Sequence, residues 1–269
     1  MTALPFFLAA PGGQRFCLFH PAPAASRGAI LYVHPFAEEL NKSRRMAAMQ
    51  ARAYAQAGFQ VLQIDLYGCG DSSGDFGDAR WQLWHDDLDL AARWLRQRCA
   101  GPLYVWGLRL GALLALEGAR RLQPDGLILW QPVVSGCAHL HQFARLQSAA
   151  RLFAAAAPEA SGATGASDEI AGYSIAAPLA AAIMAAEAAP WQPACPVHWL
   201  ELAAPVADRP PALQPASRLV VDGWRQAGAV IEAAAIADTP FWHSTEIVEA
   251  PALLAASLAA LEHAPGLAA

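Results

Sequence analysis

Two glycines four residues apart flank the segment that is best suited to carry a catalytic residue. Gly107 and Gly111 lie between an apolar run, Leu103–Trp106, and a helical pattern that begins at Leu110. Glycines at this spacing let backbone pass close to backbone at a sharp turn. The residue midway between them, Arg109, is then presented at a helix N-terminus. A nucleophile there would serve acyl transfer, but a guanidinium stays protonated at working pH and cannot attack a carbonyl.

A second glycine-rich segment imitates a serine nucleophile motif. Residues 70–74 (GDSSG) match G-x-S-x-G with Ser72 at the centre. That motif requires a helix directly after the serine, whereas residues 75–78 (DFGD) follow here. We therefore interpret the segment as a glycine-rich turn whose Ser and Asp side chains bond to backbone groups. For Cys69 beside it, we expect a packed, unreactive thiol rather than a substitute nucleophile.

Two adjacent acidic residues, Glu38 and Glu39, open a segment that is dense in charge. Two interpretations stay open. The segment is a solvated helix start with Ser43 as its N-cap. Alternatively, it places one of the two carboxylates beside Arg109, because a buried guanidinium needs a counter-charge.

Short apolar runs alternate with helical patterns along most of the chain. The runs Leu4–Ala10 and Gln14–His20, joined by a Pro-Gly-Gly turn, predict an antiparallel hairpin. Later runs are apolar on both faces, which predicts a mainly parallel twisted sheet with helices on both faces. The expected strands are Ala29–Val33, Phe59–Asp65, Leu103–Trp106, Gly126–Gln131, Val197–Leu202 and Ala229–Ala233. The expected helices are Ser43–Ala57, Trp81–Leu95, Leu110–Leu122, one within Pro211–Ala227, and Ala250–Glu262.

Regularity lapses between Pro132 and Pro190, where the sequence is rich in alanine. We expect residues 132–190 to form a helical cap inserted into a core made of residues 1–131 and 191–269. The stretch Ser161–Gly165 within it is expected to be flexible. Ligands of such sheets bind at the carboxyl ends of the strands, and the cap is expected to cover that edge.

Composition narrows the class of protein. Hydrophobic residues make up 55% of the 269 residues and charged residues 15%, which excludes general disorder. The net charge of −5 argues against a nucleic-acid-binding protein, which would carry clustered positive charge. Five scattered cysteines without a C-x-x-C pair favour a reducing cytoplasm.

Met1–Pro5 lacks the basic region of a signal peptide. The most apolar stretch, Ala176–Ala189, is too short for a membrane span. His139 and His141 lack partners at metal-ligand spacing, so no metal or cofactor is expected.

Three segments carry a resemblance to a known family: residues 34–46 (HPFAEELNKSRRM), residues 65–76 (DLYGCGDSSGDF) and residues 107–112 (GLRLGA). The chain resembles the α/β-hydrolase superfamily over essentially its whole length. More narrowly, it resembles the second type of exosortase-A-system-associated hydrolase, in which arginine at this turn is a family trait. The resemblance implies an α/β-hydrolase fold and a cytoplasmic protein that serves a bacterial exopolysaccharide and protein-sorting system.

The resemblance also implies roles for individual residues. The backbone N–H groups of Phe36 and Leu110 would form an oxyanion hole, and His34 would line the pocket beside them. His243 lies between the last strand and the last helix, which is the place of the general base. We expect the acid of the triad to be missing; Asp208 is the nearest candidate for it, because Glu201 lies within its strand.

Three functions compete at this point. The first is a diverged hydrolase of esters or thioesters, in which His243 activates water because Arg109 cannot form an acyl-enzyme. The second is a non-catalytic binder that holds an anionic acyl or sugar-phosphate ligand on Arg109 at the helix N-terminus. The third is an interaction protein that docks a partner of the same exopolysaccharide system through residues 132–190.

Overall fold

An eight-stranded sheet forms the centre of the molecule. The computed structural model describes residues 2–155, 169–170, 173–204, 210–244 and 246–262. The strands lie in the order β1-β2-β4-β3-β5-β6-β9-β10. Their bounds are β1 Leu4–Ala10, β2 Gly13–His20, β3 Gly28–Val33, β4 Phe59–Ile64, β5 Leu103–Leu108, β6 Gly126–Trp130, β9 Val197–Ala203 and β10 Ile231–Ala237. β1, β2 and β4 pair antiparallel and all other neighbours pair parallel, as the sequence predicts.

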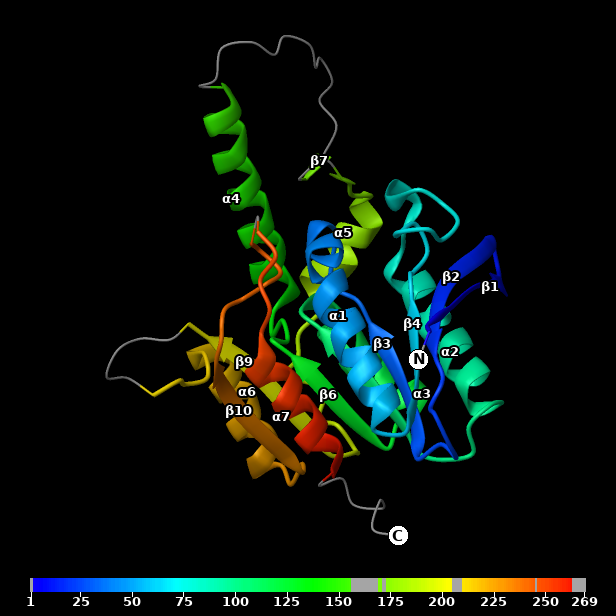
Figure 1. Cartoon of the computed structure of the whole chain (residues 1–269). Coiled ribbons are helices and arrows are strands. Elements are labelled where there is room, and N and C mark those ends of the chain that lie inside the picture. Colours follow the sequence, from blue (N-terminus) through cyan, green and yellow to red (C-terminus); the bar gives the residue numbers. More distant parts are fainter. Residues whose placement is uncertain (1, 156–168, 171–172, 205–209, 245, 263–269) are drawn as a thin grey trace.

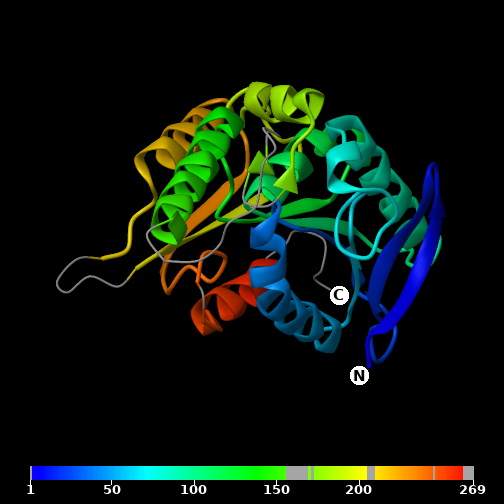
Figure 2. The same ribbon diagram turned by 90° about the horizontal axis from the view of Figure 1, so that it is seen from above.

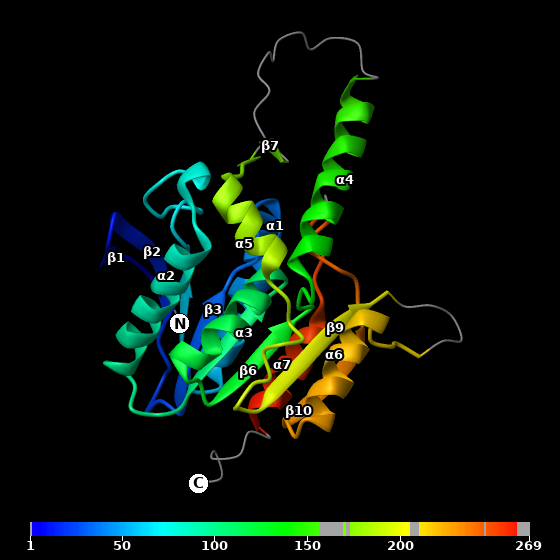
Figure 3. The ribbon, with the colours of Figure 1, turned by 180° about the vertical axis from the view of Figure 1, so that it is seen from behind.

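Helices cover both faces of this sheet (Figures 1 and 2). One face carries α1 (Glu38–Gln56) and α7 (Pro251–Glu262). The opposite face, turned to the viewer in Figure 3, carries α2 (Trp81–Arg96), α3 (Leu110–Leu122) and α6 (Pro215–Gln226). β3, β5 and β6 are buried along their whole length because they have helices on both sides. The predicted architecture is therefore confirmed.

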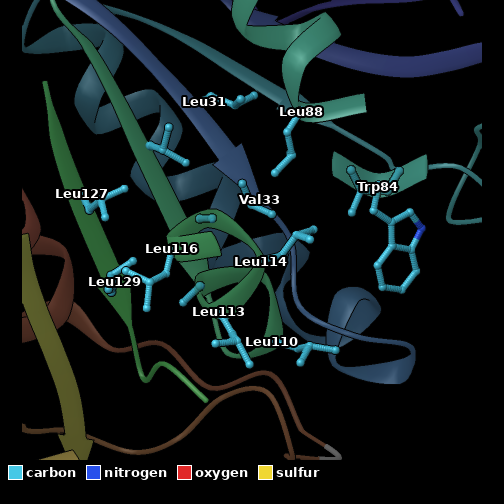
Figure 4. Close-up of a cluster of buried hydrophobic side chains, with 14 of the residues drawn as sticks. Leu31, Val33, Trp84, Leu88, Leu110, Leu113, Leu114, Leu116, Leu127 and Leu129 are labelled. Atoms are coloured by element: carbon cyan, nitrogen blue, oxygen red, sulfur yellow. The ribbon is translucent and has the colours of Figure 1, made fainter. Parts of the chain in front are cut away.

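The helix that follows the Arg109 turn is packed into the core. Figure 4 shows leucines of α3 lying between those of β3 and β6, with Trp84 and Leu88 of α2 beside them. Leu113 and Leu114 are at most 1% exposed. Burying a leucine side chain contributes about 1.5–3 kcal/mol, so this leucine cluster holds α3 rigidly beneath the turn.

The alanine-rich segment contains α4 (Gly136–Ala155) and α5 (Ala177–Ala185), with a short antiparallel pair, β7 (Glu169–Ile170) and β8 (Tyr173–Ser174). Both helices lie beyond the carboxyl ends of the parallel strands, and α4 extends away from the body (Figure 1). Ser161–Gly165 lies outside the described residues. In the part of the chain that the structure describes, no helix has the length and apolarity needed to cross a bilayer.

Several expected boundaries are wrong: β5 ends at Leu108 rather than Trp106, β10 ends at Ala237 rather than Ala233, and the starts of one helix and one strand are misplaced. The first helix begins at Glu38 rather than Ser43, because Ala37 turns the chain directly after β3 and needs no side-chain cap. Ser43 is therefore a fully buried residue within α1 and not its N-cap. The last strand begins at Ile231 rather than Ala229, because the Ala229 N–H is donated to Trp224 at the end of α6.

Candidate functional site

Arg109 occupies a tight turn between β5 and α3. Its backbone angles are φ 56° and ψ −120°, a conformation that few residues other than glycine adopt. A Cβ on Gly111 would lie 2.5 Å from the Val33 carbonyl oxygen, and one on Gly107 would lie 2.5 Å from the Ala112 Cα. Both glycines are therefore needed, because the start of α3 presses against the end of β3 and against β5.

The Arg109 side chain is held by groups from three separate elements. Its Nε donates to Glu39 Oε1 over 3.2 Å, and Nη2 lies 3.5 Å from His139 Nδ1. The guanidinium carbon sits 5.5 Å from the centre of the Trp242 ring. Arg109 is 12% exposed and Glu39 only 2%. Of the two acids left open by the sequence, Glu39 is thus the one beside Arg109.

His243 shares the same carboxylate. Its Nε2 lies 3.5 Å from Glu39 Oε1, so that this oxygen stands between the guanidinium and the imidazole. Lys42 donates to the His243 carbonyl oxygen over 3.4 Å. The ring is 39% exposed and is the most accessible member of the group. We call Arg109, Glu39, His139 and His243 the arginine cluster.

Burial and the guanidinium set the protonation of this cluster. Burial first, and then the charges of Arg109 and Lys42, lower the pKa of His243 to about 4. Burial, Arg109 and His243 lower the pKa of His139 to about 3. Both rings are therefore neutral at pH 7. Burial raises the pKa of Glu39, while the charge of Arg109 acts in the opposite direction.

The two residues expected to form an oxyanion hole lie side by side. Phe36 and Leu110 both line a small apolar hollow, together with His34 and with Trp81 and Trp84 of α2. His34 is buried and bridges two loops, since its Nε2 accepts the Leu66 N–H and its Nδ1 faces the Pro35 carbonyl. Its place is therefore beside this hollow, where it holds the loop after β4 against the loop after β3.

The remaining acids lie elsewhere. Glu38 is exposed and accepts a hydrogen bond from Tyr173 over 3.4 Å. Glu201 is buried, and its two oxygens accept hydrogen bonds from the Trp199 indole and the Gln214 backbone. Asp208 lies outside the described residues. No acid that the structure describes other than Glu39 lies within ion-pairing distance of His243.

The glycine-rich segment is a turn, as interpreted from the sequence. Ser72 Oγ donates to the Asp65 carbonyl over 2.5 Å and accepts the Phe16 N–H, which ties the turn to β2. Ser73 accepts the Gln14 N–H. Cys69 is buried, and burial raises its pKa, so the reactive thiolate is disfavoured.

Two residues of the site, His139 and Trp242, are not predicted from the sequence. His139 enters from α4, thirty residues beyond Arg109 along the chain, and only its distance of 3.5 Å from the guanidinium assigns it to the site. Trp242 precedes His243 directly, but nothing in its type or spacing indicates that its ring would lie beside a guanidinium. Both contacts depend on how separate loops meet above the sheet.

The amino-acid sequence of this chain matches a known protein family. Residues 24–208 match the family described as serine aminopeptidase, S33. The lysophosphatidylserine lipase ABHD12 of Danio rerio is 33% identical over 114 residues, which is 40% of this chain. The human protein ABHD12B is 28% identical over 115 residues, or 42% of this chain. The aligned parts are only 28% and 30% of those relatives' lengths.

Solved structures agree on the fold. A lidless α/β serine hydrolase of Xanthomonas campestris has a TM-score of 0.59 at 19% identity, covering 97% of this chain and 94% of its own. Est1E of Butyrivibrio proteoclasticus has a TM-score of 0.65 at 14% identity, covering 96% and 98%. At these identities the likeness establishes the fold. With the family match spanning more than half of its length, this chain belongs to the serine aminopeptidase S33 family of the α/β-hydrolase superfamily.

Proposed function

We propose that this chain is a diverged α/β-hydrolase that binds a small acyl or anionic ligand and forms no acyl-enzyme. The observation that carries the proposal is the 3.2 Å contact between Arg109 and Glu39 at the turn after β5. A guanidinium at the place of the nucleophile cannot attack a carbonyl.

The surroundings favour a ligand with an oxygen-rich head. The Leu110 N–H is the first of α3 and has no partner within its helix, and a helix N-terminus attracts negative charge. Lys42 adds a positive charge next to the arginine cluster, where it acts on both Glu39 and His243. A carboxylate, a phosphate or a polarised carbonyl oxygen meets these conditions.

A second candidate is hydrolysis by activated water. The partly exposed His243 supports it, because its neutral ring can accept a proton from water, although a pKa of about 4 makes it a weaker base than an ordinary histidine. The water oxygen would attack an ester or thioester carbonyl, the N–H groups of Phe36 and Leu110 would stabilise the oxyanion, and His243 would return the proton to the leaving group.

The cellular setting rests on the family resemblance. We place the protein in the bacterial cytoplasm beside an exopolysaccharide and exosortase system, with a protein of that system as a partner. We further propose that residues 132–190 act as a cap on a core of residues 1–131 and 191–269. His139 on α4 supports this division, because it reaches the arginine cluster from the inserted segment.

Fluorophosphonate labelling tests the covalent chemistry. We expect no adduct on the wild type by intact-mass spectrometry, and the same result for Ser72→Ala. A stoichiometric adduct on any serine would overturn the proposal. Turnover of p-nitrophenyl acetate that is lost in His243→Ala, without an adduct, would select the second candidate.

Butyrate titration tests the binding role. We expect saturable binding to the wild type and about tenfold weaker binding to Arg109→Lys, which keeps the charge beside Glu39 but loses the planar fork. Equal affinities for butyrate would show that Arg109 does not hold the ligand.

A further inference from the structure

A cavity of about 160 Å³ lies between α1 and the strands β2, β3 and β4. It is on the α1 face of the sheet, whereas the hollow beside Phe36 and Leu110 is bounded by Trp81 and Trp84 of α2 on the other face. The two spaces therefore lie on opposite faces of the sheet, and His34 stands in the wall of both. The walls of the α1-face cavity include Phe16, Leu18, Leu40, Ala47 and Ala48.

Small residues on α1 create this space. Ala47 and Ala48 stand where the helix faces the sheet, and a longer side chain at either position would enter the cavity. On the strand side, Phe16 and Leu18 of β2 are only partly buried. An apolar wall of this kind favours a ligand with an apolar body.

Tyr32 supplies a hydroxyl without a hydrogen-bond partner, on a residue that is almost wholly buried. The residue is 4% exposed and lines the cavity, with its ring 4.2 Å from that of Trp106. Among the described residues, no hydrogen bond joins its hydroxyl to another group, whereas the side chains of Arg44, Gln63 and Asp65 at the same cavity each have at least one. The hydroxyl oxygen itself is not fully enclosed by protein, so it is open to the cavity that Tyr32 lines. The hydroxyl is thus placed to meet a polar atom that enters the cavity.

The charged groups at the rim satisfy one another. Arg44 donates to Asp65 over 3.1 Å, and the same carboxylate oxygen accepts the Asp71 N–H. Gln63 is joined to His20 across 3.1 Å. Since the ion pair is neutral as a whole, the cavity offers no net charge to attract a charged ligand.

We propose that this cavity is a binding site for a small uncharged molecule with an apolar body and one hydroxyl or carbonyl group, which bonds to Tyr32. The site is independent of the proposed function at Arg109. Its wall and that site nevertheless share one helix, because α1 carries both Ala48 and Glu39.

Benzyl alcohol and toluene are matched probes, since they have nearly the same shape and only the first has a hydroxyl. We expect both to bind the wild type saturably in ligand-observed NMR titrations. Tyr32→Phe is expected to weaken the binding of benzyl alcohol about three- to tenfold, which is the equivalent of one net hydrogen bond. The affinity for toluene is expected to stay unchanged. Because the hydroxyl has no partner in the described protein, this variant should fold normally.

Filling the cavity provides the second arm. Ala48→Leu is expected to abolish binding of both probes, whereas Ala53→Leu, the same change on α1 outside this cavity, is expected to leave both affinities unchanged. Thermal melts of each variant establish that it is folded. Absence of saturable binding to the wild type, binding that survives Ala48→Leu, or equal losses for the two probes in Tyr32→Phe would overturn the proposal.

Discussion

Two turns in this protein share one backbone conformation and differ in the side chain that each presents and in the packing around it. Ala37 ends the loop after β3 with φ 49° and ψ −126°, and Arg109 follows β5 with φ 56° and ψ −120°. Each is the residue before a helix, α1 in the first case and α3 in the second. Neither helix has a side-chain cap. The fold thus builds the same turn at two neighbouring strands.

The difference lies in the side chains and in the packing around them. Arg109 carries a guanidinium that reaches back to Glu39 of the other helix, while Ala37 carries only a methyl group. The Arg109 turn also needs glycines on both sides, whereas no glycine flanks Ala37. The turn is therefore a property of the backbone, and the chemistry depends on which side chain stands on it.

The Arg109–Glu39 pair should give the largest effect. Arg109→Met leaves the Glu39 carboxylate buried and unpaired, so we expect the free energy of unfolding to fall by about 3 kcal/mol. Urea denaturation measures this change. The double variant Arg109→Met/Glu39→Gln removes both charges and should recover most of the loss.

An equal loss in the single and double variants would contradict this explanation. It would mean that lost packing around the arginine stem, rather than an uncompensated charge, sets the stability of this turn. Arg109→Lys is the matched control, because it keeps a positive charge beside Glu39.

Gly111 tests the packing around the same turn. Gly111→Ala would place a Cβ 2.5 Å from the Val33 carbonyl oxygen and against that of His34, so we expect a loss of about 2 kcal/mol in urea. Gly223→Ala is the control, because nothing lies within 4 Å of its Cβ in α6. That variant should gain up to about 1 kcal/mol from helix propensity. Similar changes at both glycines would mean that α3 can move away from β3.

The same contrast explains how far the sequence predicts the fold. Gly107 and Gly111 predict the Arg109 turn. The helix predicted after it, Leu110–Leu122, has the same bounds in the structure. Ala37 carries no such signal, and the nearest capping residue, Ser43, misplaces the start of α1 by five residues. Positive φ at an alanine is set by tertiary contacts, which local sequence patterns do not contain.

The misplaced start of α1 is also the reason why the sequence does not decide which of the two glutamates lies beside Arg109. With α1 starting at Glu38, Glu39 lies in the first turn and reaches Arg109, while Glu38 points to solvent. A helix begun at Ser43 could not separate the two acids. His139 could not be found at all, because its approach depends on how α4 packs over the strand ends.

Ala37 allows a smaller test of backbone strain. Ala37→Gly relieves an unfavourable positive φ, but it also frees the unfolded chain and removes a buried methyl group. We expect a net gain of about 1 kcal/mol or less by urea denaturation. Ala255→Gly, an exposed position in α7, should lose about 1 kcal/mol. A comparable loss at Ala37 would show that this turn is unstrained.

The smallest expected effect is the pH dependence that His243 confers on the Arg109 turn. Its pKa is lowered to about 4 by burial, Arg109 and Lys42, whereas an unfolded histidine titrates near 6.5. Between these pH values the unfolded chain takes up a proton that the folded protein does not. The free energy of unfolding should therefore decrease as the pH falls from about 6.5 to about 4.

Glu39 acts in the opposite sense, because its raised pKa lets the folded protein bind a proton first as the pH falls. His139, with a pKa of about 3, adds to the His243 effect. The wild-type profile is the sum of all three, and only a variant isolates one ring. His243→Asn should flatten the decrease between pH 6.5 and 4 in urea titrations, by a modest amount because water screens a ring that is 39% exposed. Parallel profiles for His243→Asn and the wild type would mean that this ring titrates alike in the folded and unfolded chains, and that Arg109 does not govern its charge.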